Sequence, residues 1–536
     1  MKRRTFIQGA LGAAAIAPVM LDRVYARPSS PLSLLAQLDA VNNDKILVLV
    51  QLFGGNDGMN TVIPGDDVNY PLYQNLRPTI SIDKSQLYNY GGIYMNPGLV
   101  RGDKRGFAGM FEVGSLAVLQ GIGYDKPNLS HFRSTDIWLS GINPDDNLNV
   151  VLNTGWLGRF LEQRYPSFPA SLPQDPLAIN FGGFSLALTS EKGRMGIEVA
   201  NPNLQAGGLD AGADTLDDKH AGTRYEIEYA FVSDIANRSN VYAQRVKDAY
   251  TNGKAKLKGN YASDGFAQQM GSVAALIAGG LDTRVYVVGV GGFDTHVNQA
   301  SDDHSGTGAH ANLLGQVADA IAQFQYDLLQ LDQSGKKVSN RVLGLTMSEF
   351  GRRPHENGSY GTDHGAASVQ FVFGTQVAGG VFGQTADLAH LDANSDLPWQ
   401  IDYRSVYTSL LVDWFGMTLD DARTVLADTN KNLNPLPGLL KAQAGVSANP
   451  IERLSLGVYP NPMASRASAA IELPRAGVVQ LELNSMDGRQ TQTIVERSFA
   501  AGSYSIPFTT DLAAGAYLLS LRTDGEQVSR LVQITR

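Results

Sequence analysis

The chain of 536 residues contains no cysteine. This absence excludes disulfides, a cysteine nucleophile and thiolate metal sites, so any bound metal must be held by His, Asp, Glu or hydroxyl oxygen. It also excludes a formylglycine made from cysteine, which ordinary sulfatases need. The chemistry open to this chain is therefore that of imidazole, carboxylate and hydroxyl groups.

Basic residues are fewer than acidic ones. Lys and Arg together number 43, against 52 Asp and Glu, and the formal net charge is -9. This balance offers no basic face suited to nucleic acid, and we predict no nucleic-acid partner. The chain is too long for one small core, so two or more domains are expected.

The N-terminus has the pattern of a twin-arginine export signal. Arg3 and Arg4 precede a mild apolar run over 10–20 and a small-residue cleavage site at Ala26. We predict that residues 1–26 are the signal and that the twin-arginine machinery exports the chain. An amphipathic or membrane-anchoring N-terminus is disfavoured, because the run is too short and too rich in Ala and Gly to span a bilayer. The mature chain is expected to have no transmembrane span.

Three apolar runs end in the same way, with a small residue followed by an acid. The acids are Asp57, Asp294 and Glu349, and the runs cover 45–53, 284–290 and 341–347. Buried parallel strands deliver polar ligands at their carboxyl ends, which meet at one edge of a sheet. We therefore expect the three acids to share one site.

Histidines follow two of these strand ends. His296 lies two residues after Asp294, and the pair Asp363 and His364 follows Glu349 in a Gly-flanked segment. Asp and His two residues apart project to the same side of an extended segment and can share one ion. So many carboxylate and imidazole ligands predict a divalent metal, which we take to be Zn, Ca, Mg or Mn.

Two further candidates lie at the start of an expected short helix over 128–141. Ser130 is either the N-cap or a nucleophile, because a hydroxyl at a helix N-terminus near a strand end is where an anionic substrate would be placed. His131 is a ligand, a base or a packed imidazole. We take Ser130 and His131 as the candidate catalytic residues.

Substrate-binding candidates lie on the same loops. Asn56 and Asn60 flank Asp57, and Arg352 follows Glu349 closely. Arg352 could neutralise Glu349 structurally or clamp a phosphate or sulfate group, and the sequence favours neither reading.

The segments between these motifs indicate an α/β fold over 40–445. An amphipathic helix over 309–331 connects the second and third apolar runs, and strand, helix, strand in that order favours a right-handed crossover. Further strands are expected over 115–120 and 369–373, with helices over 266–277 and 403–414. The pattern predicts a doubly wound, mostly parallel sheet.

From Leu454 the pattern changes to short alternating runs separated by turn residues. A Pro-, Gly- and Ala-rich boundary over 432–450 precedes it. We predict a small all-β sandwich over 450–536. It carries no His and no acid cluster, so we expect no chemistry there.

Five motifs stand in a fixed order over about 40–440. They are Gly54-Gly55-Asn56-Asp57-Gly58-Met59-Asn60, Ser130-His131-Phe132, Gly292-Phe293-Asp294-Thr295-His296, Ser348-Glu349-Phe350-Gly351-Arg352 and Gly361-Thr362-Asp363-His364-Gly365. Together they resemble the bacterial family called domain of unknown function 1501, which is placed within the alkaline phosphatase and sulfatase superfamily. The resemblance implies a doubly wound sheet of alkaline phosphatase-like type. It also implies one or two divalent metals at the strand ends and a nucleophile at a helix start.

The resemblance also implies roles for single residues. Asp57 corresponds to the first-strand metal aspartate, and Asp294, His296 and His364 correspond to one metal site. Glu349 stands where the superfamily usually has an Asp-His pair. Alternatively Asp363 and His364 are that pair, with His390 completing the set. The hydroxyl of Ser130 suits a nucleophile, whereas the usual spacing of the superfamily's helix places the nucleophile nearer His131.

The C-terminal part carries a second set of motifs, namely Val458-Tyr459-Pro460-Asn461-Pro462, Met486-Asp487-Gly488-Arg489 and a Gly-Ala-Tyr strand within 512–519. These resemble the type A sorting domain of the type IX secretion system of Bacteroidetes-like bacteria. The resemblance implies the type IX machinery as a partner, with passage through the periplasm to the cell surface or the medium. A small immunoglobulin-like binding module would show a similar alternation.

Two functions follow as hypotheses. The first is an exported, metal-dependent hydrolase of phosphate or sulfate esters, with a small-molecule or polysaccharide ester as substrate. The second is a non-catalytic cell-surface binding protein on an alkaline phosphatase-like scaffold.

Overall fold

The structure is a computed structural model. It describes residues 44–100, 106–144, 150–169, 171–183, 185–200, 242–332, 337–441 and, with gaps of one or two residues, 454–535. The export signal over 1–26, residues 442–450 of the boundary and part of the Tyr459-Pro460-Asn461-Pro462 motif lie outside these residues.

A mixed sheet of nine strands is formed by residues between 46 and 402. Eight strands follow the order β15-β5-β14-β11-β1-β10-β6-β9, and β16 pairs with β5. Their bounds are β1 Ile46–Leu52, β5 Leu116–Gly123, β6 Ala178–Asn180, β9 Ile197–Glu198, β10 Val285–Val290, β11 Val342–Met347, β14 Ser368–Phe373, β15 Gly380–Phe382 and β16 Ile401–Asp402.

The three acid-tipped strands are neighbours in this sheet. β1 lies between β10 and β11 and is parallel to both, with Leu49 opposite Val287 on one side and Leu345 on the other. All three therefore end at the same edge, as the sequence predicted. Within this sheet, as far as the structure describes it, β14 runs against its neighbours β11 and β5 while the other pairs are parallel, which makes the sheet mixed.

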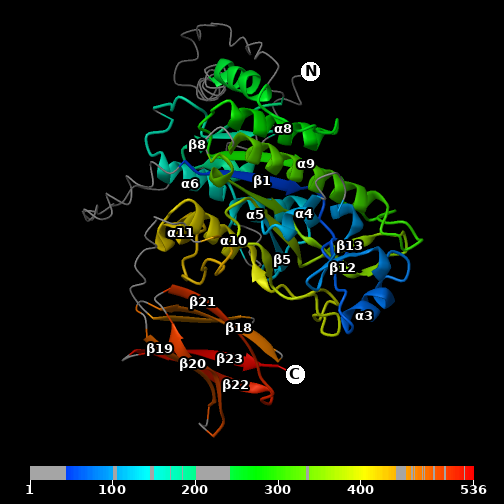
Figure 1. The fold of residues 1–536 in the computed structure, drawn as a ribbon, viewed down its shortest axis with the longest axis vertical. Helices are drawn as coiled ribbons and strands as arrows, with labels where there is room; N and C mark the ends of the chain where they lie inside the picture. The colour runs from blue at the N-terminus through cyan, green and yellow to red at the C-terminus, as the bar shows by residue number, and fades with distance from the viewer. Residues whose placement is uncertain are drawn as a thin grey trace. The chain divides into compact units, whose positions relative to one another are not determined.

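Helices cover both faces of the sheet (Figure 1). Side chains alternate along β1, so Val48 and Val50 pack with α8 and α9, whereas Leu47 and Leu49 pack with the helices of the other face. The first face carries α4 Gly106–Glu112, α8 Gly265–Ala278 and α9 Ala309–Asp332; the second carries α5 His131–Ser140, α6 Trp156–Arg164, α10 Tyr403–Ser409, the π-helical turn Leu410–Trp414 and α11 Leu419–Val425.

The expected helices over 266–277 and 309–331 correspond to α8 and α9. Asp264 caps α8 by accepting a hydrogen bond from the backbone of Ala267. Along α9 the buried positions Leu314, Val317, Ile321 and Leu328 form one stripe, which is why the helix packs on the sheet.

Smaller elements extend the loops at the carboxyl edge. The antiparallel hairpin of β12 Gly351–Glu356 and β13 Thr362–Gly365 follows β11 and brings Arg352 opposite His364. Others are α3 Asn69–Leu76 and the sheet of β2 Val62–Ile63, β3 Tyr88–Tyr90 and β4 Ile93–Met95. The pair β7 Thr189–Ser190 and β8 Gly193–Arg194 lies elsewhere, beside the end of α6.

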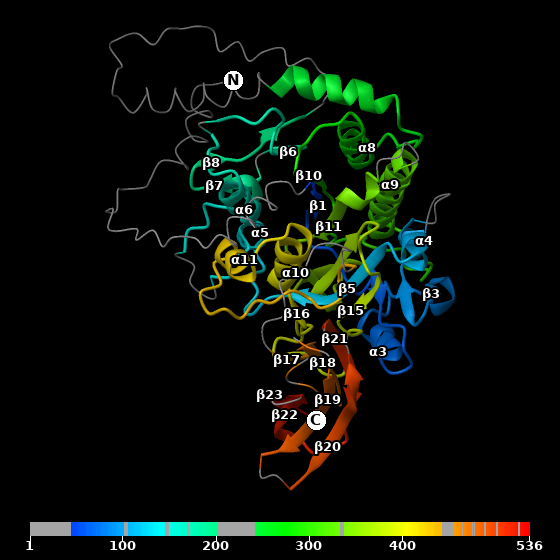
Figure 2. The same ribbon diagram turned by 60° about the vertical axis from the view of Figure 1, so that its left-hand side comes forward.

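The C-terminal residues form two antiparallel sheets (Figure 2). One contains β17 Ser455–Tyr459, β18 Arg466–Leu473 and β21 Gly502–Thr509; the other contains β19 Gly477–Ser485, β20 Thr491–Phe499, β22 Gly515–Thr523 and β23 Glu526–Ile534. Buried side chains from both sheets, such as Ile471 and Leu519, form one core. This is the arrangement of a small sandwich.

None of the described helices combines the length and the apolar character that a bilayer crossing requires.

Candidate metal centre

The loop after β1 fits closely against the other two strand ends. Gly54 and Gly55 have positive φ angles of 122° and 84°. A side chain at position 54 would meet the backbone of Phe293 and Asp294, and one at position 55 would meet the ring of Phe350. The Gly-Gly-Asn-Asp motif is therefore explained by this close approach as well as by its turn.

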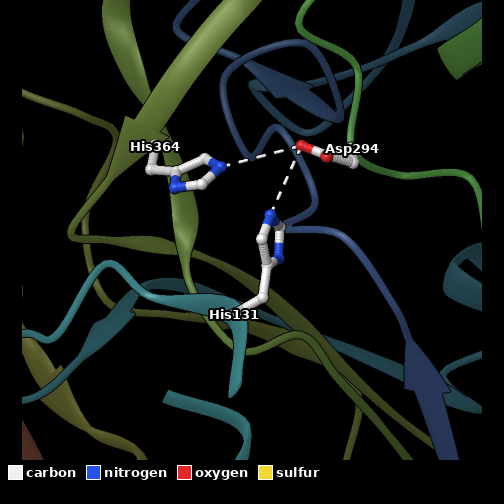
Figure 3. A group of neighbouring side chains, drawn as sticks. All are labelled: His131, Asp294 and His364. Carbon is white, nitrogen blue, oxygen red and sulfur yellow. Dashed lines mark ion pairs between the residues drawn. The ribbon is translucent and has the colours of Figure 1, made fainter. Parts of the chain in front are cut away.

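Three side chains from three elements converge at this edge. His131 Nε2 lies 3.5 Å from Asp294 Oδ1, and His364 Nε2 lies 3.6 Å from the same oxygen. Figure 3 shows the two rings turned toward Asp294 from α5 and β13. In the described part of the chain these three residues have the arrangement of a group able to hold a metal ion.

His296 adds a fourth donor to the group. Its Nε2 lies 3.1 Å from Asp294 Oδ1 and 2.9 Å from His364 Nε2. We call His131, Asp294, His296 and His364 the four-residue cluster.

The second nitrogen of each ring is held by an oxygen. His131 Nδ1 lies 2.8 Å from Glu349 Oε1, and His364 Nδ1 lies 2.8 Å from the carbonyl oxygen of Leu129. His296 Nδ1 lies 3.1 Å from Asp363 Oδ1. Because carbonyl and carboxylate oxygens accept, a proton on each Nδ1 satisfies these three contacts, and the tautomer that has it leaves an Nε2 lone pair facing the cluster. Such outer partners orient the histidine ligands of metal sites.

The distances from Asp294 to the three ring nitrogens fit one ion. Donors at about 2.0–2.1 Å from a tetrahedral zinc are roughly 3.3 Å from one another. The nitrogen-to-Asp294 distances of 3.1, 3.5 and 3.6 Å bracket this value. Imidazole and carboxylate ligands suit zinc and other first-row divalent metals better than calcium, which prefers oxygen ligands alone. The donors present therefore fit a divalent metal.

Protonation favours ligation as well. Burial acts to raise the pKa of Asp294, but the hydrogen bond and charge of Arg352 and the nearby histidines outweigh it and lower the pKa. Burial lowers the pKa of His364, an effect partly opposed by its bond to Leu129 and reinforced by Arg352. The cluster therefore has an ionised carboxylate and at least one imidazole that resists protonation.

Buried aromatic packing fixes two of the rings. Phe350 is buried, and its ring lies 4.8 Å from that of His131 and 4.3 Å from that of His364, measured between centroids. At the start of α5, Ser134 donates to the carbonyl oxygen of Glu349. Residues 349 and 350 thus hold both the helix and the ring of His131.

The cluster remains open to solvent. The side chains of Asp294, His296 and His131 are 50%, 39% and 33% exposed. A small ligand in solution can therefore reach the donors.

Asp57 lies outside the cluster. Its carboxylate is fully buried and accepts two bonds from Arg77, at 2.6 Å to Oδ2 and 3.0 Å to Oδ1. Gln299 and the backbone of Met59 and Asn60 donate to the same carboxylate. Burial acts to raise the pKa of Asp57, yet Arg77 outweighs it and lowers the pKa. Both oxygens are occupied, so in this arrangement Asp57 serves as the counter-ion of Arg77.

The predicted substrate-binding residues are buried. Asn60 bonds Tyr73, Arg77 and the carbonyl oxygen of Ile80, while the Oδ1 of Asn56 accepts from Thr61 and His310. Arg352 is 1% exposed. Its guanidinium donates to Asp294 at 2.7 Å and to the backbone oxygens of Gly54, Gly55, Phe293 and Thr362. The structure thus gives Arg352 the neutralising role, directed at Asp294.

Glu349, Asp363 and Ser130 border the cluster. Glu349 and Asp363 meet the Nδ1 side of His131 and His296, as outer partners. Ser130 is exposed at the N-cap position of α5, and its side chain makes no cap hydrogen bond. His390 bonds Asp387 and is 75% exposed.

Sequence reasoning missed Arg77 and Gln299. Arg77 lies in an irregular segment 20 residues after Asp57, and Gln299 follows His296 by three residues. No sequence signal marked either residue, because their importance comes from burial.

Comparison with known proteins adds a family match. Residues 217–427 match the model of a family described as protein of unknown function (DUF1501). Asp294, His296 and His364 lie within the matched stretch. No curated protein matches the chain in sequence.

Among solved structures, the chain is similar to a Bacteroides thetaiotaomicron protein labelled 4S-sulf and described in connection with the metabolism of multiple glycosaminoglycans. The identity is 10%, the match covers 85% of this chain and 89% of that chain, and the TM-score is 0.32. We therefore infer neither fold nor activity from this similarity.

Proposed function

We propose that this chain is an exported, metal-dependent hydrolase of phosphate or sulfate esters, with one divalent ion held by His131, Asp294, His296 and His364. The observation that carries the proposal is the convergence of three Nε2 atoms on Asp294 while an oxygen holds each Nδ1. Metal-ligating histidines almost always have such an outer partner on their second ring nitrogen.

The chemistry that a bound ion supplies is polarisation of the ester oxygen and a lowered pKa of a hydroxyl or water. Two of the protein's own contacts prepare the donors for such an ion. Glu349 keeps the proton of His131 on Nδ1, and Arg352 keeps Asp294 ionised. Ser130, exposed beside His131, is our candidate nucleophile, and a water is the alternative.

Several features support placing the fold in the alkaline phosphatase and sulfatase superfamily. Helices cover both faces of the sheet, and the cluster lies at the carboxyl ends of parallel strands. The family match over 217–427 includes the three motifs around Asp294, Glu349 and His364 and supports the resemblance there. We propose the doubly wound, alkaline phosphatase-like arrangement on these grounds.

Export is proposed from the sequence motifs. We infer a twin-arginine signal over 1–26 and a type IX sorting domain over 450–536, which would take the enzyme through the periplasm to the surface or the medium. A phosphorylated or sulfated polysaccharide, or a smaller ester, is the proposed substrate. The two-sheet core of residues 454–535 supports a separate C-terminal domain.

The experiment compares metal content and turnover in matched variants. The purified chain is analysed by elemental mass spectrometry and assayed on aryl phosphate, phosphodiester and sulfate esters with added Zn, Mn, Mg or Ca. The double variant Asp294→Ala/His296→Ala should lose both the ion and turnover, whereas His390→Ala should keep both, because His390 lies on the surface and bonds Asp387. Turnover retained in the double variant would overturn the assignment.

The second candidate function is a binding protein on the same scaffold. The burial of Arg352 favours it, because this cation is committed to internal partners and is not free to clamp an anion. It predicts a retained ion with no turnover on any ester.

A further inference from the structure

Gln299 is a fully buried residue that joins the segments carrying the cluster. Its Oε1 accepts from Thr295 Oγ1 at 2.9 Å and from Thr362 Oγ1 at 2.6 Å. Thr295 stands between Asp294 and His296, and Thr362 stands two residues before His364. One amide oxygen therefore links the loop after β10 to strand β13.

The amide nitrogen of Gln299 contacts Asp57, which lies outside the cluster. Gln299 Nε2 donates to Asp57 Oδ2 at 2.5 Å. An ionised carboxylate only accepts, and the two hydroxyl groups donate to the oxygen, so the orientation of the amide is determined by its partners.

Asp57 is in turn held by Arg77 through two parallel bonds. Arg77 also donates to the backbone oxygens of Arg353 and Pro354 on β12. The chain of contacts from Arg77 through Asp57 and Gln299 to the two threonines is buried throughout, where hydrogen bonds are strong and an unpaired group is costly.

Backbone bonds run alongside these side-chain contacts. Gln299 N donates to Tyr360 O at 2.8 Å, and Thr362 N donates to Thr295 O at 3.2 Å. His310 N donates to Gln299 O at 3.0 Å, which ties the segment to the start of α9. The two loops therefore meet at Gln299 through both side chains and backbone.

We propose that Gln299 is a positioning residue, which sets the separation of the pair Asp294 and His296 from His364 and so determines the affinity and geometry of the metal site. The inference rests on the proposed function for the ion itself. It does not require that the chain hydrolyse any ester. Without the amide, the two threonine hydroxyls lose their shared acceptor and the loops lose the link that fixes their spacing.

The test replaces Gln299 with Met, which keeps the length of the side chain and removes its hydrogen bonds. Gln325→Met is the matched control, because Gln325 is buried on α9 and, among the described residues, neither of its amide atoms has a partner. The full chain is used. Zinc affinity is measured by competition with a chromogenic chelator, and coordination is followed by the visible absorption of bound Co²⁺.

We expect Gln299→Met to bind zinc 10- to 100-fold more weakly, as for other outer-partner losses, with an altered Co²⁺ spectrum. Gln325→Met should match the wild type in both. Wild-type zinc affinity and an unchanged Co²⁺ spectrum in folded Gln299→Met would overturn the inference. If that variant does not fold, Thr295→Val and Thr362→Val each remove one of the two bonds, and unchanged spectra in both would overturn it equally.

Failure of the proposed function gives a different result. A wild-type chain that takes up neither Zn²⁺ nor Co²⁺ overturns the metal site and with it the role of Gln299. An ion bound equally well by wild type and by the Gln299 and threonine variants overturns the positioning role alone.

Discussion

The Nε2 atoms of His296 and His364 lie 2.9 Å apart. Asp363 holds the Nδ1 proton of the first ring, and the Leu129 carbonyl holds that of the second. In the neutral state two lone pairs therefore face each other, and either a shared proton or a metal ion must separate them. The ion that we propose would separate these two nitrogens, so we expect the stability of the chain to depend on it.

Metal removal should therefore lower thermal stability. An ion that binds only the folded chain stabilises it by about 2.7 kcal/mol at a free concentration of 100 times its Kd. We expect the Tm to fall on treatment with a chelator and to recover with added zinc, as measured by differential scanning calorimetry. The variant His296→Ala/His364→Ala should show no response to either treatment. An equal response in wild type and variant would place the ion elsewhere.

Glu349 should act on metal affinity through His131. The Oε1 atom accepts from His131 Nδ1 at 2.8 Å and from Gly54 N at 2.9 Å, and the carboxylate is buried. We expect Glu349→Ala to weaken zinc binding 10- to 100-fold, because the ring of His131 loses both its orientation and its basicity. Glu349→Gln keeps an acceptor and should bind zinc more tightly than Glu349→Ala. Chelator competition measures all three constants.

Glu356→Gln is the control for this experiment. Glu356 lies at the end of β12, on the hairpin that follows Glu349, but accepts from Thr79 and Ile80, away from the cluster. Its replacement should leave zinc affinity unchanged. If Glu349 were itself a ligand, Glu349→Gln would instead lose the ion almost as completely as Glu349→Ala.

Replacing Asp57 should lower the free energy of unfolding but leave the number of zinc ions bound per chain unchanged. It is fully buried with Arg77, and removing one partner of such a pair costs about 3–5 kcal/mol, because the other charge is left unpaired. We expect Asp57→Ala to lower the free energy of unfolding by about that amount in urea. It should still bind one zinc per folded chain at saturation.

The surface pair of Arg194 and Glu198 provides the comparison, since both side chains are more than a third exposed. Glu198→Gln should change the free energy of unfolding by less than about 1 kcal/mol. Loss of the zinc in folded Asp57→Ala would restore Asp57 to the ligand set.

Five strands of the sheet, and the shared edge of β1, β10 and β11, could be predicted from the sequence, whereas the short strands β6, β9, β15 and β16 were not. The apolar runs that became β1, β10 and β11 are buried on both faces, so they lack the alternation of half-exposed strands and can be recognised by length and glycine boundaries. The helix over 309–331 followed from its 3.6-residue period. The direction of β14 could not be inferred, because a short buried strand has the same composition in either direction.

The candidate site was harder to predict from the sequence. Asp57 and Asp294 both follow a Gly-Gly pair, yet the first is fully buried against Arg77 and the second is half-exposed in the cluster. The difference depends on an arginine 20 residues away, which no local pattern marks. Similarly, Glu349 and Asp363 look like ligands in the sequence, and only the geometry places them on the Nδ1 side of the histidines.

His310 should make the stability of the metal-free chain depend on pH. It is 1% exposed, and burial lowers its pKa to about 4, an effect opposed by Asp57 and reinforced by Arg77 and Arg352. Its Nε2 lies 3.0 Å from Asn56 Oδ1. In the unfolded chain its pKa returns to about 6.5. Between these values the unfolded chain binds more protons, so the free energy of unfolding falls as the pH is lowered from 6.5 toward 4.

The gap between the two pKa values corresponds to about 3 kcal/mol, fully retained above pH 6.5. His310→Gln keeps a donor for Asn56 and removes the titration. We therefore expect the wild type to lose about 3 kcal/mol more than this variant between pH 6.5 and 4, measured by urea unfolding with chelator present. Asp57 interacts with His310, but Arg77 lowers its pKa so that it stays ionised over this range, and the other carboxylates and histidines are common to both chains; the difference therefore reports on His310. Parallel pH profiles would show that the buried imidazole gains a compensating partner when it is protonated.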